Sequence, residues 1–232
     1  ILSGALNLIP ANATLDNYLQ VFDEVPFGRY FVNSLVLGIG GAVTNIFFGA
    51  LGGYALAKLQ FKGRAAVFAV FLSSLMIPGI ITMIPSFLIL RSIPFAGGND
   101  VFGQGGLGLI NTYWAVIIPG AAGAFAVFFM KQFFETLPDE LGEAARIDGA
   151  GPMKQFRHVT MPAIAPTLLL VSIISVAGFF QLFAEPYVMT QGGPAQSTVT
   201  VLYFMYEEGF KWWNLGSASA VAFILFLCIF AV

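Results

Sequence analysis

The stretch FVNSLVLGIGGAVTNIFFGALGGYALA, residues 31–57, holds no charged side chain and lies between Tyr30 and Lys58. A helix needs about 20 mostly apolar residues to cross the hydrocarbon core of a bilayer, so this stretch is long enough for one crossing. Its length and its lack of charge therefore predict a membrane-spanning helix.

Four more apolar stretches follow the first one along the chain. Each lies between charged segments, which is the pattern of a membrane span. The stretches are residues 65–90, about 112–130, about 163–184 and from Leu215 onward. Five spans predict an all-α polytopic membrane protein. The last stretch is still apolar at Val232, whereas a last span usually closes with basic residues, so we expect it to be unfinished.

The composition of the whole chain agrees with this class. Of 232 residues, 58% are hydrophobic and only 9% are charged, whereas a typical soluble domain carries about 25% charged residues. So few charges cannot cover a globular surface. The formal net charge of -2 leaves no basic field to hold nucleic acid, and the single cysteine, Cys228, excludes a disulfide framework and a cysteine-based zinc site.

The basic residues are unevenly distributed, and their positions predict the orientation of the spans. Seven of the ten fall in two segments, one between the first and second spans and one between the third and fourth. They are Lys58, Lys62, Arg64, Lys131, Arg146, Lys154 and Arg157. Because basic loops stay on the cytoplasmic side, both segments are predicted to be cytoplasmic. Residues 1–29 are then outside, and we expect them to form an external loop.

The second cytoplasmic segment, residues 135–162, reads ETLPDELGEAARIDGAGPMKQFRHVTMP and has helix signals of its own. Pro138 and the acidic residues after it favour a helix start, because proline tolerates the first turn and carboxylates face the positive end of the helix dipole. Gly149 favours the helix end, because glycine readily adopts the left-handed conformation. A second short helix is predicted from about Met153 to Thr160, before the next span opens.

Small residues are concentrated around this predicted glycine turn. Small side chains would let the surface of another protein approach the backbone closely, which is the profile of a docking element. The residues are Ala144, Ala145, Gly149, Ala150 and Gly151. The alternative interpretation is a loop that only caps the bundle, with alanines chosen for their high helix propensity.

Residues 135–162, called the EAA-like segment below, resemble the EAA loop of permease subunits from binding-protein-dependent ABC importers. The matching positions are Glu143, Ala144, Ala145, Asp148, Gly149, Ala150, Phe156 and Pro162. Met161 replaces the leucine that is commoner in the family, which is a mild departure. The stretches LDNYLQVF at 15–22, YALAKLQFKGR at 54–64 and QGGPAQSTVT at 191–200 are similar to the carbohydrate branch, particularly the maltose-permease-like subunits.

The resemblance implies a type I ABC importer transmembrane domain over residues 30–232. Family members usually have six spans, so we expect the first to be absent from this chain. The implied partners are a second permease subunit, a pair of ATPase subunits that bind ATP and Mg and receive the EAA-like segment in a cleft, and an external solute-binding protein that delivers a sugar or related polyol. The implied location is the plasma membrane of a bacterium or archaeon, and no cofactor is expected in this chain.

Four polar or helix-breaking residues in the spans are candidates for a translocation pathway. Helix breakers are tolerated at membrane depth where protein or a cavity satisfies the freed backbone groups, and an ionisable residue there is a functional candidate by default. The candidates are Pro78, Pro85, Gln181 and Glu185. We expect Gln181 to lie one helical turn before Glu185, where the pair would offer hydrogen bonds to a hydroxylated solute. The alternatives are proline kinks accommodated by neighbouring helices and a polar pair that joins two helices.

Sequence motifs for nucleotide binding and catalysis are absent. No G-x-x-x-x-G-K-[ST] occurs, so ATP hydrolysis is expected in a partner subunit and this chain is not expected to be an enzyme. The single histidine, His158, has no visible partner nucleophile, and no metal site is predicted. The rival hypothesis is a secondary transporter or channel driven by an ion gradient, which predicts paired ionisable residues near the midplane. Only Glu185 is such a residue, and this hypothesis leaves the EAA-like segment unexplained.

Overall fold

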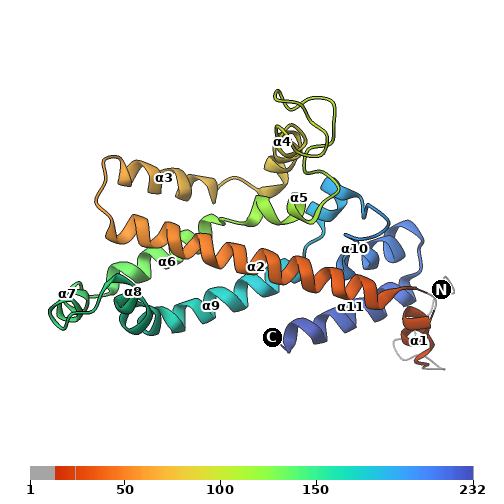
Figure 1. Ribbon diagram of the computed structural model, residues 1–232. Helices are drawn as coiled ribbons and strands as arrows, with labels where there is room; N and C mark the ends of the chain where they lie inside the picture. Colours follow the sequence, from red (N-terminus) through yellow and green to blue (C-terminus); the bar gives the residue numbers. More distant parts are fainter. Residues whose placement is uncertain (1–13, 24, 232) are drawn as a thin grey trace.

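The computed structural model describes residues 14–23 and 25–231, and it is mostly helical, as predicted (Figure 1). In the first half of the chain the helices are α1 (Asp16–Asp23), α2 (Phe27–Lys58), α3 (Arg64–Ser74), α4 (Gly79–Arg91), α5 (Tyr113–Ile117), η1 (Ile118–Gly120) and α6 (Ala124–Thr136). In the second half they are α7 (Glu140–Ile147), α8 (Pro152–Gln155), η2 (Phe156–Thr160), α9 (Met161–Phe180), η3 (Pro186–Thr190), α10 (Val201–Tyr206), η4 (Glu207–Lys211) and α11 (Leu215–Phe230).

The long helix α2 runs through the centre of the molecule, and α6 and α9 pack along it (Figure 1). Glycines let the backbones approach closely. A Cβ at Gly49 would lie 2.8 Å from the Cβ of Ala126, and one at Gly53 would lie 2.6 Å from the Cβ of Met130. Neither position accepts a side chain unless the helices separate. The two glycines have the spacing of a small-xxx-small motif, and here the motif packs helices within one chain.

Two continuous helices are long and apolar enough to cross a membrane, namely α2 and the helix that runs from Met153 to Phe180. Two further candidates are pairs of helices that meet at a bend, α3 with α4 at 109° and Tyr113–Gly120 with α6 at 42°. Length and composition therefore support two to four spans, and the predicted count of five is not confirmed. The fifth predicted span corresponds to α11, which has 16 residues.

The second predicted span, residues 65–90, is not one straight helix, because it breaks between α3 and α4. Pro78 lies at the break with extended backbone, and the residue before a proline is disfavoured in the helical conformation. Pro85 lies inside α4 without ending it. One proline therefore redirects the chain, and the other is accommodated as a helical residue.

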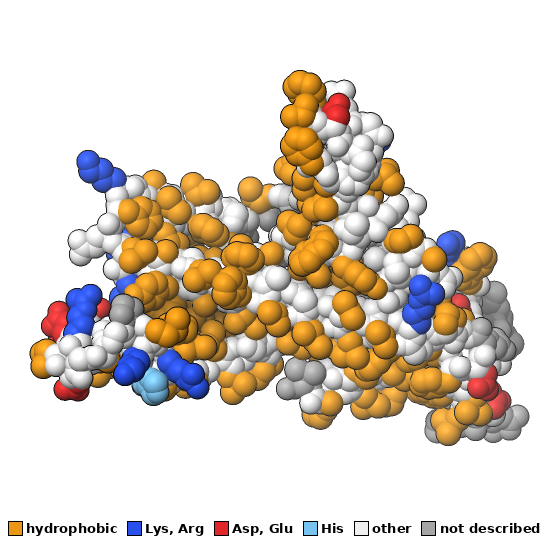
Figure 2. All heavy atoms as spheres, viewed as in Figure 1, with side chains coloured by type: hydrophobic (Ala, Val, Ile, Leu, Met, Phe, Trp, Pro, Cys, Tyr) orange, Lys and Arg blue, Asp and Glu red, His pale blue; other side chains and the backbone are white. Residues whose placement is uncertain are grey.

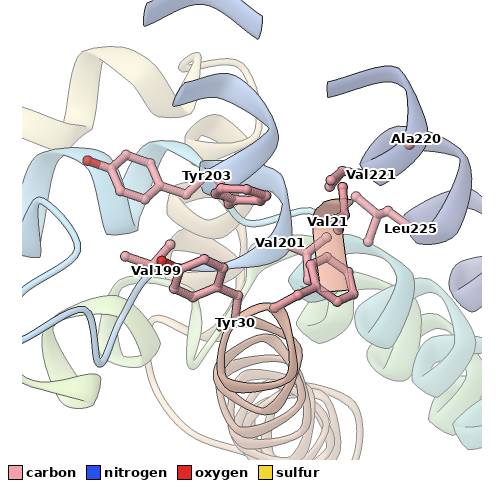
Figure 3. Close-up of a cluster of buried hydrophobic side chains, with 10 residues drawn as sticks. Val21, Tyr30, Val199, Val201, Tyr203, Ala220, Val221 and Leu225 are labelled. Carbon is pink, nitrogen blue, oxygen red and sulfur yellow. The ribbon is translucent and has the colours of Figure 1, made fainter. Parts of the chain in front are cut away.

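A cluster of buried hydrophobic side chains joins the N-terminal end of α2 to α1, α10 and α11. Figure 3 shows Tyr30 of α2 near Val201 of α10 in this cluster. Val21 of α1 is buried in it as well. An external loop was predicted over residues 1–29, and within it Asp16–Asp23 form the helix α1, whose Val21 packs against α11. Residues 1–13 lie outside the described ranges.

Polar side chains of α2 hold the irregular segment before α10. Nδ2 of Asn33 donates hydrogen bonds to the carbonyls of Gln196 and Val199, each at 3.0 Å. Oγ of Ser34 accepts a hydrogen bond from the N–H of Val201 at 2.9 Å. These bonds satisfy backbone groups that no regular secondary structure pairs.

Candidate functional site

The first predicted helix of the EAA-like segment is α7, and its end confirms the predicted glycine turn. Gly149 follows α7 in the left-handed conformation, with φ of +78°. The N–H of Ala150 donates to the carbonyl of Ala145 at 2.9 Å, and the N–H of Gly149 donates to the carbonyl of Arg146 at 3.0 Å. This pair of bonds is the Schellman motif, which satisfies the last carbonyls of a helix. The turn is therefore fixed by backbone bonds.

The second predicted helix of the segment is present, but it is not separate from the span that follows. The chain is continuously helical from Met153 to Phe180, whereas a break was expected before Pro162. Residues 156–160 adopt the wider π-helical winding. A proline in a helix loses one hydrogen bond and crowds the preceding turn, and the wider turn gives Pro162 room. The polar segment therefore passes directly into the apolar helix α9.

The residues that match the EAA pattern lie mostly at the surface. Those that are exposed are Glu143, Ala144, Asp148, Gly149, Phe156 and Pro162, whereas Ala145 and Ala150 are half-buried. Two apolar side chains beside them are strongly exposed, Ile147 at 86% and Met153 at 75%. Small residues flanked by exposed apolar side chains form a surface suited to contact with another protein.

A cleft of about 580 Å³ separates much of α7 from the helical bundle. Glu143 and Arg146 of α7 line one side of the cleft, and Tyr54, Lys58 and Phe134 at the ends of α2 and α6 line the other. Among the helices, α7 packs chiefly on α8 and η2. The cleft therefore lies between this side of α7 and the ends of α2 and α6.

The start of the segment is tied to α2 by Lys58. Nζ of Lys58 donates a hydrogen bond to the carbonyl of Leu137 at 2.7 Å and forms an ion pair with Asp139. In the sequence analysis, Lys58 was used only to predict the orientation of the spans. Its position in the last turn of α2 is the signal that was missed, because a cation there can reach the carbonyls of helix C termini.

Further charged side chains lie near Lys58 and the start of the EAA-like segment. Glu135 accepts a hydrogen bond from Nζ of Lys131 at 2.7 Å and lies 3.7 Å from Arg64. Figure 2 shows charged side chains gathered on the left, around α7 and α8, and a largely hydrophobic surface toward the middle of the molecule. Within the described residues, no group of three or more His, Cys, Asp or Glu side chains is placed to hold a metal ion.

An apolar groove of about 550 Å³ lies between α2, α6 and α9. Phe47 and Leu51 line it from α2, and Ile164 and Leu168 line it from α9. Phe156 of the EAA-like segment lines the same groove. This phenylalanine therefore belongs both to the polar segment and to the apolar part of the molecule.

The structure places the proline candidates, Pro78 and Pro85, at the start of α4 and within it. Met83 of α4 forms a buried cluster with Met189 of η3. The segment that leads into η3 carries Glu185, so the prolines and this glutamate lie on elements that pack against each other.

Gln181 and Glu185 do not lie one turn apart on a single helix, which corrects the sequence prediction. α9 ends at Phe180, and Gln181 is its C-cap residue, with Nε2 donating to the carbonyl of Ala177 at 2.9 Å. Glu185 is the N-cap residue of η3, which begins at Pro186. Within the described residues no hydrogen bond joins the two side chains.

Long apolar helices with a charged helix and turn at one end are typical of a multi-span membrane protein. The family described as "Binding-protein-dependent transport system inner membrane component" matches residues 45–232, so the chain belongs to this family. The match confirms the predicted resemblance to permease subunits of binding-protein-dependent importers.

Curated relatives cover almost the whole chain. The diacetylchitobiose uptake system permease protein NgcG of Streptomyces coelicolor is 29% identical over 239 residues, covering 99% of this chain and 74% of that protein. The arabinooligosaccharides transport system permease protein AraQ of Halalkalibacterium halodurans is 32% identical over 225 residues, covering 95% of this chain and 76% of that protein.

Solved structures share the fold. A bacterial ABC transporter involved in the import of the acidic polysaccharide alginate matches with a TM-score of 0.76 at 21% identity, covering 97% of this chain and 79% of that chain. A bacterial alginate ABC transporter in complex with its alginate pentasaccharide-bound periplasmic protein matches with a TM-score of 0.74 at 17% identity, covering 94% and 80%. At these identities the likeness establishes the architecture alone.

Proposed function

We propose that the chain is a membrane-spanning subunit of an ATP-driven importer that translocates a sugar or related polyol. An external solute-binding protein delivers the solute, and a second permease subunit completes the pathway. The carbohydrate class is supported by the names of NgcG and AraQ, which refer to diacetylchitobiose and arabinooligosaccharides. The external binding protein is supported by the family description and by the periplasmic protein in the alginate complex.

The observation that carries the coupling part of the proposal is the turn at Gly149. Its Schellman bonds fix α7 as a short helix with Glu143 and Ala144 exposed beside Ile147. A separate ATPase subunit, which binds ATP and Mg, contacts this surface in the cytoplasm. Closure of the ATPase around nucleotide then moves α7, and α7 moves the membrane helices.

The pathway part of the proposal rests on the packing of α4 against the segment before η3. Pro78 directs α4 out of line with α3, and Glu185 is half-buried on the facing segment. A carboxylate is a strong acceptor for the hydroxyl groups of a sugar. Pro78, Pro85, Gln181 and Glu185 are therefore proposed to lie along the path of the solute.

The test is reconstitution of the complete importer, with both permease subunits, the ATPase pair and the binding protein, into liposomes. A panel of sugars is first screened against the binding protein. The loaded binding protein should raise ATP hydrolysis, and internal accumulation of its sugar should require ATP. Uptake that persists without ATP and collapses when an ion gradient is dissipated would instead establish a secondary transporter.

A further inference from the structure

Two helix C termini near the EAA-like segment are capped by basic residues from other helices. Arg64, the first residue of α3, donates from Nη1 to the carbonyls of Ala57 at 3.3 Å and Leu59 at 3.4 Å, at the end of α2. Lys58, the last residue of α2, donates to the carbonyl of Leu137, the C-cap residue of α6. Cations are favourable at these positions because a helix C terminus carries partial negative charge. α3 thus caps α2, and α2 caps α6.

Lys58 also holds the start of α7. Asp139 is the N-cap residue of α7, and Oδ1 of its carboxylate lies 2.5 Å from Nζ of Lys58. Only Pro138 separates Asp139 from Leu137 in the chain. The ammonium group therefore sits at the joint where α6 ends and α7 begins, and it is bonded to both sides of that joint.

The bonds of Lys58 at this joint affect the direction of α7 more than they affect the stability of the fold. The Lys58 side chain is 21% exposed and that of Asp139 is 80% exposed, and ion pairs with so much access to water stabilise a protein weakly. The cleft of about 580 Å³ leaves much of α7 without support from the bundle. The bonds of Lys58 therefore act mainly on the direction in which α7 leaves α6.

We propose that Lys58 is a positioning residue that transmits movement of α7 to α2. Displacement of α7 pulls on Asp139, and the ammonium group passes this displacement to the end of α2, the helix on which α6 and α9 pack. The inference rests on the proposed function, since it takes the EAA-like segment to be the contact site for the ATPase.

The test compares variants in the complete reconstituted importer. Lys58→Met removes the ammonium group and keeps much of the side-chain length, and Lys58→Arg restores a cation. Asp139→Asn removes the negative charge of the ion pair at an exposed N-cap position, where asparagine is as favourable as aspartate. Lys62→Met is the matched control, because Lys62 is exposed and makes no hydrogen bond or ion pair within residues 14–23 and 25–231. The measured quantities are copurification of the ATPase, ATP hydrolysis and sugar transported per ATP.

Lys58→Met is expected to lower the sugar transported per ATP severalfold while the ATPase still copurifies, because movement of α7 would no longer be passed on to α2. Asp139→Asn should lower it less, Lys58→Arg should recover most of it, and Lys62→Met should leave it unchanged. A normal ratio in both Lys58→Met and Asp139→Asn overturns the proposal, and Asp139→Asn decides alone if Lys58→Met does not insert. Absence of ATP-driven uptake in the wild-type importer would instead refute the proposed function.

Discussion

Asn33 on α2 donates a hydrogen bond to the carbonyl of Val199, 166 residues further along the chain. The same amide group donates to the carbonyl of Gln196. Asn33 is only 4% exposed, so water cannot readily replace it as the donor. These two bonds fix the irregular segment before α10 against the central helix, and they connect parts of the chain that are far apart in sequence.

Asn33→Leu is expected to loosen this segment. The buried carbonyl of Val199 would lose its donor, which costs about 1–3 kcal/mol, so the purified protein should unfold at a lower temperature. Proteolysis within residues 191–200 should also become faster. Thr44→Val is the control, because within the described part of the chain its hydroxyl bonds only to the carbonyls of Gly40 and Gly41 in the same helix. Equal losses of stability in the two variants would contradict the role given to Asn33.

Gly53→Ala is expected to push α2 and α6 apart. The added Cβ would lie 2.6 Å from the Cβ of Met130 and 2.8 Å from the backbone N of Lys131, and backbone cannot move aside as a side-chain tip can. Overpacking of this kind costs about 1–3 kcal/mol, which thermal unfolding in detergent would detect.

Gly28→Ala in the same helix is the matched control for this substitution. A Cβ at Gly28 meets nothing within 4 Å, and alanine favours a helix, so its stability should be unchanged or slightly higher. If the Gly53 variant is as stable as the Gly28 variant, the close approach of α2 and α6 is wrong.

Gly149→Pro is expected to abolish binding of the ATPase while membrane insertion stays normal. Proline fixes φ near −65°, whereas the turn after α7 needs φ of +78°, so the Schellman turn cannot form. Glu143→Lys should have the same effect by reversing an exposed charge on α7. Copurification of the ATPase with the permease measures both.

Gly142→Ala serves as the control for the coupling variants. Gly142 lies within α7, and a Cβ there meets nothing within 4 Å. Its ATPase should therefore copurify normally. Normal copurification with Gly149→Pro and Glu143→Lys as well would refute the assignment of the EAA-like segment as the ATPase contact.

Glu185→Gln is expected to lower sugar uptake by about tenfold, the effect of losing one charge-assisted hydrogen bond. Assembly with the ATPase should be unaffected, because Glu185 lies outside the EAA-like segment. Glu208→Gln is the control, since this side chain is occupied by a hydrogen bond from Asn214. Unchanged uptake in the Glu185 variant removes this residue from the proposed pathway.

Local signals in the sequence were sufficient to predict the EAA-like helix and its end. Acidic residues at the start of α7 and a glycine just after it affect only the few residues around them. The start and end of this helix can therefore be predicted from the local sequence. The start of α11 at Leu215 and the start of the third apolar helix beside Thr112 were predicted from apolar stretches that lie next to charged segments.

Features that depend on contacts between distant parts of the chain were not predictable in this way. The 109° bend at Pro78 requires knowledge of what packs on α4, since Pro85 has the same residue type and does not end the helix. The continuous helix through Pro162 depends on a π-helical turn that no pattern of residues predicts. The bonds of Lys58 likewise depend on a contact between distant parts of the chain, because the end of α2 lies beside the end of α6.

The glycine contacts of α2 constrain how the molecule changes shape. Where backbones touch through Gly49 and Gly53, few flexible side chains are present to absorb sliding or rotation of α2 against α6. Toward α9 the contact is with a side chain instead, since a Cβ at Gly38 would lie 2.8 Å from the ring of Phe180. The close packing of α2, α6 and α9 therefore favours movement of these three helices as one rigid body.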